Sequence, residues 1–407
     1  MKILFIASHL PHARSRAGLQ IVYQRMKRLV ERGHRVGLCA LQGKSEGIGQ
    51  DPLYEELVEV RRIPAPSRRS LPGRVRDYVW SRIPPPYWPY HTPALYKAVG
   101  DMVQASKYDV VLAEFTPMGQ CLFENPWLPA VRKVISAHDC ASVARRSPLF
   151  LPERSFQRAV REHLIRRDIR RFELDLHRTV DRVLTLNRSD AFLLQAYEPS
   201  VRVSVVPPGI DYAYYQAAQT VSQPEPSLLF TGQYRDESNQ DGFAWFVQHV
   251  WSVLSGRRPE LTFHAVGPNP SLAMKLFSQQ YRGVHVPGEL ADIRPLMQRA
   301  SLFVCPIRMG SGVRVKILEA MAAGLPVVCT STAAEGIPIQ TGVNAVIADD
   351  PARMAEAIEL LLDDAALRAR IADNARRMVQ ERFDWDRSID LLEATLADLL
   401  PGAMRDP

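Results

Sequence analysis

Short apolar runs alternate with amphipathic runs along most of the chain. In the first half, strand-like runs such as KILFIAS, HRVGLCAL and YDVVLAEF accompany the helix-like run LQIVYQRMKRLVERG. The same alternation returns in the second half with SLLFTG, FAWFVQHVWSVLS, LTFHAVG, LFVCPI and LPVVCT. Near-continuous apolar strands that alternate with helices predict parallel sheets covered on both faces. We therefore expect two doubly wound α/β domains, with ligands beyond the carboxyl ends of the strands and in the cleft between the domains.

A proline-rich stretch separates the two halves. The segment VPPGIDYAYYQAAQTVSQPEPS shows no helical or strand period, which is typical of an interdomain connection. We predict an N-terminal domain over 1–206, a linker over 207–226, a C-terminal domain over 227–380, and a closing helix and tail over 381–407. Tyr78–Tyr96 breaks the alternation and is predicted to be an insertion or lid.

Composition narrows the class of protein. The 407 residues are 46% hydrophobic and 23% charged, which indicates an ordinary globular protein of two or three domains. The five cysteines are odd in number and lack C-x-x-C spacing, so we expect neither a disulfide nor a zinc site. The first apolar run is too short for a signal peptide, and no run approaches the ~20 residues of a spanning helix. These features predict a cytoplasmic location.

The charge is distributed unevenly. Residues 1–226 hold 33 lysines and arginines against 22 acidic residues, whereas the remaining residues hold 18 against 22. Many arginines fall in Arg154–Arg178, where apolar residues recur at helical spacing. This helix can lie on an anionic membrane surface at the inner face of the membrane, or it can be a packed helix with a solvated face. The basic residues are dispersed, and we expect no nucleic-acid partner.

Aromatic residues cluster before residue 91. Tyr87, Trp88 and Tyr90 can stack against a sugar or a lipid, or they can pack against their own domain. Both interpretations stay open.

The most informative stretch runs from Leu302 to Val328. It predicts a buried strand that ends at Pro306, a glycine-containing loop, and a helix that begins near Val313 and ends at Gly324, ahead of Pro326. Glycines in such a loop let a ligand approach the backbone, and unpaired N–H groups at a helix start bind phosphate.

Two cations fall in the first turn of this helix. The helix dipole disfavours Arg314 and Lys316 at that position, and a bound anion would remove the conflict. The alternative is a pair of solvated charges.

The stretch resembles the signature of the family-4 retaining glycosyltransferases of the group 1 type, which have the GT-B fold. Further landmarks occur in the family's order: ERGHRV, VISAHD, VVPPGID and FDWD. The resemblance implies two Rossmann-like domains facing across a cleft, with the nucleotide-sugar donor in the second and a glycan or lipid-linked acceptor in the first. The pattern G-x-G-x-R-x-K-x-L-E is similar to a sub-branch of exopolysaccharide and cell-envelope biosynthesis. The implied activity is that of a retaining hexosyltransferase.

The resemblance also implies roles for individual residues. Glu319 matches the second glutamate of the family's Glu-x7-Glu motif, which binds the ribose hydroxyls of the donor. Ser311 stands where the first glutamate is usual, and the backbone of the turn at 309–313 would substitute for it. After Thr231 and Gly232, where relatives carry an arginine and a lysine, only Arg235 remains nearby. The phosphate charge is therefore assigned mainly to Arg314 and Lys316.

Two more residues match family positions in the first domain. Gly18 corresponds to a loop against the donor phosphates, and His138 corresponds to a histidine that touches the transferred sugar. The predicted catalytic residues are His138, Arg314 and Lys316. The predicted donor-binding residues are Gly18, Arg235, Gly310, Ser311, Gly312, Val313 and Glu319.

No metal and no cofactor are expected besides the donor, because no Asp-x-Asp pair is suitably placed. Two alternatives remain. The unusual Ser311 suits a catalytically inactive scaffold that binds a sugar nucleotide. A nucleotide-sugar epimerase of similar fold would need acid and base carboxylates around the sugar, and we identify no such pair.

Overall fold

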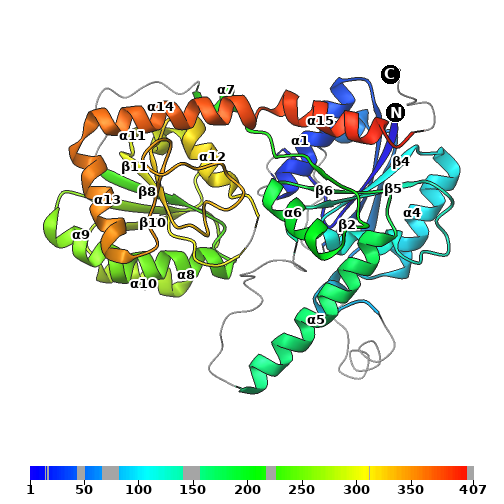
Figure 1. Cartoon of the computed structure of the whole chain (residues 1–407), viewed down its shortest axis with the longest axis horizontal. Coiled ribbons are helices and arrows are strands. Elements are labelled where there is room, and N and C mark those ends of the chain that lie inside the picture. The colour runs from blue at the N-terminus through cyan, green and yellow to red at the C-terminus, as the bar shows by residue number, and fades with distance from the viewer. Residues whose placement is uncertain are drawn as a thin grey trace. The chain divides into compact units, whose positions relative to one another are not determined.

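The chain forms two α/β units in a computed structural model (Figure 1). The structure describes residues 1–13, 15, 18–43, 51–66, 82–140, 156–216, 226–310 and 312–400. Within these ranges, unit 1 extends to Pro207 and includes the residues from Ser388 on, and unit 2 comprises Pro208–Arg387. Among the described helices, none is both long and apolar enough to cross a membrane.

Unit 1 is built on a seven-stranded sheet in the order β3-β2-β1-β4-β5-β6-β7, with every neighbouring pair parallel. The strand order reverses between β1 and β4, whose carboxyl ends form the switch point at which such sheets bind ligands. The strands are β1 (Lys2–Ala7), β2 (Arg35–Gln42), β3 (Val60–Pro64), β4 (Val110–Glu114), β5 (Arg132–Ala137), β6 (Arg182–Thr185) and β7 (Val203–Val205).

Helices cover this sheet because their apolar faces pack on its buried strands. They are α1 (Gly18–Glu31), α2 (Leu53–Glu56), α4 (Pro93–Ser106), α5 (Phe156–Arg178) and α6 (Arg188–Tyr197), with 3-10 turns over Pro85–Tyr90 and Thr116–Leu122.

Unit 2 contains a six-stranded sheet in the order β10-β9-β8-β11-β12-β13, again with parallel neighbours. Its switch point lies between β8 and β11. The strands are β8 (Ser227–Thr231), β9 (Thr262–Val266), β10 (Val284–Gly288), β11 (Leu302–Cys305), β12 (Val327–Cys329) and β13 (Val346–Ile347). The two parallel sheets confirm the predicted doubly wound α/β class.

The helices of unit 2 surround its core cluster of apolar residues. They are α7 (Tyr212–Gln216), α8 (Glu237–Phe246), α9 (Ser252–Arg257), α10 (Leu272–Gln280), α11 (Arg294–Arg299), α12 (Val315–Ala322), α13 (Pro351–Asp363) and α14 (Ala365–Arg382), with a π-helical turn over Val247–Trp251.

Parts of the predicted linker and of the predicted tail are folded into the two units. Residues 217–225 of the linker lie outside the described residues, but Tyr212–Gln216 forms α7, which packs on α12. The last helix, α15 (Trp385–Ala397), belongs to unit 1 from Ser388 on. There Arg32 donates to Asp390 and Glu393, both at 2.6 Å. The tail of the chain therefore completes the first unit.

The predicted insertion at Tyr78–Tyr96 is described from residue 82 on, and there it is part of the core of unit 1. The ring of Tyr87 is buried against Phe172, and its hydroxyl donates to the buried Glu173. Trp88 donates from Nε1 to the Ile83 carbonyl at 2.9 Å. Packing against the domain, one of the two open interpretations, therefore holds for Tyr87 and for Tyr90, which also packs against this core.

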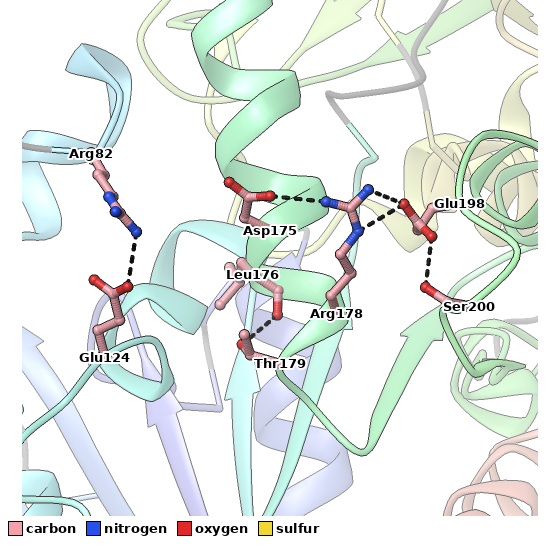
Figure 2. Close-up of polar contacts among 8 residues, drawn as sticks. All are labelled: Arg82, Glu124, Asp175, Leu176, Arg178, Thr179, Glu198 and Ser200. Atoms are coloured by element: carbon pink, nitrogen blue, oxygen red, sulfur yellow. Dashed lines mark hydrogen bonds and ion pairs between the residues drawn. The ribbon is translucent and has the colours of Figure 1, made fainter.

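Helix α5 packs on the core of unit 1 through its C-terminal turns. Its last turns are fixed by Arg178, which donates to Asp175 at 3.0 Å and to Glu198 (Figure 2). Figure 1 shows the opposite end extending away from the sheet of unit 1. Within this helix, which the sequence predicts can lie on a membrane, Arg166, Arg167 and Arg171 are exposed, whereas Arg170 lies over the ring of Tyr197, 4.0 Å from its centroid.

Candidate functional site

The glycine turn in unit 2 follows β11 and leads into α12. Gly310 and Gly312 have φ angles of 95° and 86°, in the left-handed region that favours glycine. Ser311 between them lies outside the described residues. The helix begins at Val315, two residues later than predicted, after Arg314 as its N-terminal cap. Glycine at both positions therefore allows the left-handed backbone of the turn between β11 and α12.

The predicted helix end is confirmed. Gly324 has a φ of 82° and donates from its backbone N to the Met321 carbonyl at 3.0 Å, while Leu325 donates to the Ala320 carbonyl at 2.9 Å. These two bonds form a Schellman motif, which satisfies the last carbonyls of the helix.

Some amides at the helix start are already bonded to the turn. The backbone N of Val315 donates to the Val313 carbonyl at 3.1 Å, and that of Ile317 donates to the Arg314 carbonyl at 2.9 Å. These two amides are not available to a ligand. The positive charge of this site therefore comes chiefly from the side chains.

Lys316 is half-buried next to α8. Its Nζ donates to Asn239 Oδ1 at 2.6 Å and lies 4.9 Å from the centroid of the Phe230 ring. Burial lowers the pKa of Lys316 to about 8, and the charge of Arg314 acts in the same direction. Asn239 is itself fixed, because its Nδ2 donates to the Gln233 carbonyl at 2.8 Å. The lysine is thus held in place with part of its charge uncompensated.

Arg314 turns back onto the loop, where its Nη2 donates to the Met309 carbonyl at 3.2 Å. Burial raises the pKa of the neighbouring Asp236, while Lys316 and Arg314 both lower it, so these three charges lie close together. Arg235 is exposed, and within the described residues its guanidinium makes no hydrogen bond or ion pair. The structure therefore gathers Arg314 and Lys316 but does not add Arg235 to them.

Glu319 lies one turn further along α12 and contacts α7. The hydroxyl of Tyr215 donates a hydrogen bond to its carboxylate; burial raises the pKa of Tyr215, and the charge of Glu319 raises it further. Glu319, the residue predicted to bind ribose, is therefore held from one side by Tyr215, which belongs to the segment expected to be a linker.

In unit 1, His138 follows β5 and contacts the end of β4. Its Nε2 and Oε2 of Glu114 are hydrogen-bonded at 2.7 Å. Glu114 also forms an ion pair with Arg25 of α1, whose Nη1 lies 3.1 Å and 3.3 Å from the two carboxylate oxygens. Arg25 and Glu114 are completely buried, and His138 is 5% exposed.

The Glu114 carboxylate is ionised in spite of its burial. Burial alone would raise the pKa of Glu114, but Arg25, His138 and the hydroxyl of Ser136 together lower it to about 2. Arg25 is further held by Ser136 Oγ at 2.7 Å and by the Val206 carbonyl at 3.3 Å. The result is a buried polar chain that leads from α1 to the histidine.

Gly18, the first residue of α1, lies against the same histidine. A Cβ on Gly18 would lie 2.5 Å from Cε1 of Phe115 and 3.0 Å from Nδ1 of His138. The Phe115 ring lies tilted over the imidazole, with centroids 4.2 Å apart and an interplanar angle of 35°. The backbone of Phe115 has a φ of 71°, which is strained for a residue with a side chain. The position therefore tolerates only glycine.

The predicted site residues thus form two groups. Gly18 and His138 belong to unit 1, and the remaining described residues, apart from Arg235, lie on one turn and one helix of unit 2. Sequence reasoning missed Arg25, Glu114, Asn239 and Tyr215. A signal existed for the first two, because Arg25 falls in the apolar stripe of α1 and Glu114 ends the apolar run YDVVLAE.

A separate pocket of about 250 Å³ in unit 2, lined by residues that include Gln340, Asn374 and Arg377, contains none of the predicted site residues. Among the described residues there is also no group of three histidines, cysteines or carboxylates that could hold a metal ion.

Two family profiles match the chain, one for each half. The profile described as Glycosyltransferase Family 4 matches residues 20–214, and the profile described as Glycosyl transferases group 1 matches residues 225–364. The chain belongs to the group 1, family-4 glycosyltransferases. The resemblance inferred from the α12 motif is thereby confirmed.

Known proteins similar to this glycosyltransferase include an uncharacterized 44.6 kDa protein in the cps region of Klebsiella pneumoniae, which is 21% identical over 68% of this chain and 71% of that protein. A D-inositol 3-phosphate glycosyltransferase of Salinispora arenicola is 34% identical, but over only 26% of this chain and 25% of its own length.

Solved structures confirm the GT-B fold of this glycosyltransferase. Sucrose-phosphate synthase from Thermosynechococcus elongatus superposes with a TM-score of 0.69 at 17% identity, covering 98% of each chain. The Anabaena protein HepE in complex with UDP-glucose gives a TM-score of 0.66 at 18% identity, covering 98% of this chain and 100% of that one.

Proposed function

We propose that this glycosyltransferase is a retaining enzyme that moves a sugar from a nucleoside-diphosphate sugar to a glycan or lipid-linked acceptor. The observation that carries the proposal is the arrangement on α12. Arg314 and Lys316 follow the glycine turn side by side, and Glu319 lies one helical turn beyond them. Two cations beside one carboxylate match a diphosphate joined to a ribose.

The cations would bind the diphosphate of the donor. Lys316 is kept in place by Asn239, while its half-buried ammonium gains from any anion that offsets its loss of hydration. Glu319, oriented by Tyr215, would accept hydrogen bonds from the ribose hydroxyls. The fold's similarity to a protein solved with UDP-glucose supports a donor of this class.

The same cations would stabilise the leaving diphosphate. Charge builds up on the leaving group as the bond to the sugar breaks, and fixed cations stabilise that charge where other enzymes use a metal ion. Metal independence is therefore part of the proposal. The leaving phosphate would take the acceptor proton, so the proposal assigns no protein base.

His138 would contact the transferred sugar. Its buried position beside Gly18 leaves Nδ1 next to a backbone without a side chain. A sugar hydroxyl is the kind of group that fits a single buried ring nitrogen.

We propose polysaccharide or cell-envelope synthesis as the pathway. The similarity to a protein in a cps region supports this assignment. A lipid-linked acceptor would also agree with weak attachment to an anionic membrane through the exposed arginines Arg166, Arg167 and Arg171 of α5.

Vesicle co-sedimentation tests the membrane part of the proposal. At low salt the protein should sediment with vesicles that contain anionic lipid, and salt on the order of 0.5 M should release it, because the attraction is screened. Changing Arg166, Arg167 and Arg171 to Gln should abolish binding. Arg170→Gln is the matched control, because Arg170 lies on Tyr197. If the protein does not bind anionic vesicles at low salt, the arginine face of α5 is simply solvated, and the membrane part of the proposal is wrong.

A donor panel tests the activity. Nucleoside diphosphates with different bases are compared by calorimetry, and the sugar donors of the preferred base are then tested for slow hydrolysis without acceptor. The proposal requires hydrolysis of at least one donor with retention at the anomeric carbon. Tight donor binding without any hydrolysis or transfer would instead establish the inactive scaffold.

A further inference from the structure

His138 is the last member of a buried polar chain in unit 1. Arg25 donates to Glu114, and Glu114 is hydrogen-bonded to His138. Polar groups this far from solvent are stable only where partners satisfy them. The hydrogen-bond partners of each polar atom therefore determine which atoms of this polar chain carry a hydrogen.

The surroundings of Glu114 place a hydrogen on Nε2 of His138. Arg25 Nη1 reaches both carboxylate oxygens, and the Ser136 hydroxyl donates to the carboxylate as well. An ionised carboxylate with such partners can only accept hydrogen bonds. The 2.7 Å contact with Nε2 must then be an N–H donated by the histidine. In the neutral ring the other nitrogen, Nδ1, carries the lone pair.

Nδ1 lies against the backbone of Gly18, where a Cβ would collide with the Phe115 ring. It is buried and makes no hydrogen bond to any of the described residues. It lies 3.0 Å from the position of a Cβ on Gly18, and the Phe115 ring covers one face of the imidazole. The backbone of Phe115 has a φ of 71°, which is strained for a residue with a side chain. Among the described residues, Nδ1 is therefore an unused hydrogen-bond acceptor beside Gly18.

We propose that Arg25 and Glu114 are positioning residues that keep the hydrogen of His138 on Nε2, so that Nδ1 accepts a hydrogen bond from a sugar hydroxyl. The proposal rests on the proposed function, because it takes the ligand to be a sugar. Neither Arg25 nor Glu114 touches the ligand, and both act through the orientation and tautomer of the histidine.

Nitrogen-15 NMR of the histidine-labelled full chain tests the tautomer directly. The signal of His138 among the 10 histidines is identified by its disappearance in His138→Asn. Under mildly alkaline conditions the free protein should show a protonated Nε2 and a bare Nδ1. A hydrogen on Nδ1, in the opposite tautomer or in a cationic ring, would overturn the proposal. This measurement needs no substrate, so it decides the tautomer even if no donor is turned over and the proposed function fails.

The substitution Glu114→Gln tests the positioning role. The carboxamide keeps the shape of the side chain, and its oxygen accepts the hydrogen bond from Arg25. Its NH2 group then faces Nε2 of His138 and donates to it. The hydrogen of the imidazole therefore moves from Nε2 to Nδ1. Turnover of the donor should then fall roughly tenfold to a hundredfold. Affinity for the nucleoside diphosphate, bound by unit 2, should stay within about twofold of wild type.

Glu173→Gln is the matched control, because Glu173 is also a fully buried carboxylate of unit 1 but is bonded to Tyr87. It should leave the tautomer of His138 and the turnover unchanged. An equal loss of turnover in both variants would show a structural role only and overturn the proposal.

Two substitutions of the histidine separate its nitrogens. The carboxamide of Asn reaches the position of Nδ1, whereas that of Gln reaches the position of Nε2. His138→Asn should therefore keep the larger share of turnover, measured per folded molecule. Greater activity in His138→Gln would contradict the assignment of Nδ1 to the ligand.

Discussion

The two candidate sites hold their charges in opposite ways. Around His138 in unit 1, Arg25 and Glu114 are completely buried and compensate each other within hydrogen-bond distance. On α12 in unit 2, Arg314 and Lys316 are half-buried charges of the same sign, and Asp236 and Glu319 offset the charge of Lys316 only in part, because burial still lowers its pKa. The charges of the first site are paired directly, whereas the charge of Lys316 in the second is compensated only in part.

This difference separates positioning from binding. A buried ion pair that is already satisfied gains nothing from a ligand, but it fixes the geometry of the residue attached to it and is costly to break. Two neighbouring cations repel each other and gain from an anion placed between them. We therefore expect substitutions in unit 1 to affect folding first, and substitutions in unit 2 to affect donor binding and turnover.

The largest expected effect is that of Arg25→Met on stability. The substitution leaves the Glu114 charge buried without its cation, which typically costs about 3–5 kcal/mol of unfolding free energy. Arg314→Met in unit 2 should cost less than about 1 kcal/mol, because that side chain is partly solvated. Hydrogen exchange of peptides from β4 and β11 measures each unit separately.

The double variant Arg25→Met with Glu114→Gln is the control for this comparison. It removes both charges and should be more stable than Arg25→Met alone. If Arg25→Met destabilises unit 1 no more than Arg314→Met destabilises unit 2, the contrast between the two sites is wrong.

The second effect concerns turnover. Changing both Arg314 and Lys316 to Ala should lower the turnover rate by on the order of 10²-fold or more, because preorganised charges at the leaving group are lost. Hydrogen exchange in the core of unit 2 should stay unchanged. EDTA should not affect the wild type.

Arg257→Ala serves as the matched control for this loss. Arg257 also belongs to unit 2, and it pairs with Glu359 at 2.9 Å on the surface. Its removal lowers the net charge by one, against two in the double variant, but should leave turnover intact. Activity that EDTA abolishes and magnesium or manganese restores would contradict a mechanism based on these side chains.

Glu319→Ala gives the third effect. Donor affinity should fall by about 1.5–3 kcal/mol, the usual contribution of hydrogen bonds to a charged group. Tyr215→Phe should have a smaller effect, because the carboxylate remains and only its orienting donor is lost. Calorimetry with the nucleoside diphosphate and its deoxyribose analogue tests both, since the analogue should bind Glu319→Ala and wild type alike. Unchanged affinity of the ribose form for Glu319→Ala would refute the assignment.

The sequence predicts local features more completely than distant pairings. The apolar runs predict both sheets, and Gly324 with Pro326 predicts the end of α12, because these signals lie within a few neighbouring residues. The partners Arg25 and Glu114 are 89 residues apart, and Lys316 and Asn239 are 77 apart. Such contacts depend on the tertiary fold, and periodicity along the chain does not determine them.

Misassigned elements have a related cause. The segment Tyr212–Gln216 lies between prolines and carries only five helical residues, which is too short to show a period. It forms a helix because it packs on α12, and Tyr215 thereby reaches Glu319. The sequence does not decide whether Tyr87 contacts a ligand or the core, because its partner, the buried Glu173, is contributed by α5, distant in sequence.

The smallest expected effect is a dependence of donor binding on pH. Burial lowers the pKa of Lys316 to about 8 in the free protein, so the ammonium loses its proton as the pH rises through that value. A diphosphate binds the charged form, and binding must then take up a proton. Affinity should be constant below about pH 8 and fall by up to about tenfold for each further pH unit, the limiting slope for uptake of one proton. Calorimetry in buffers of different ionisation enthalpy measures both the affinity and the proton uptake.

Lys316→Arg keeps its charge at all these pH values and should abolish the slope, whereas Lys275→Arg on α10 should retain it. A wild-type affinity that is flat above pH 8 would mean that Lys316 does not face the phosphates, and the comparison between the two sites would then depend on Arg314 alone.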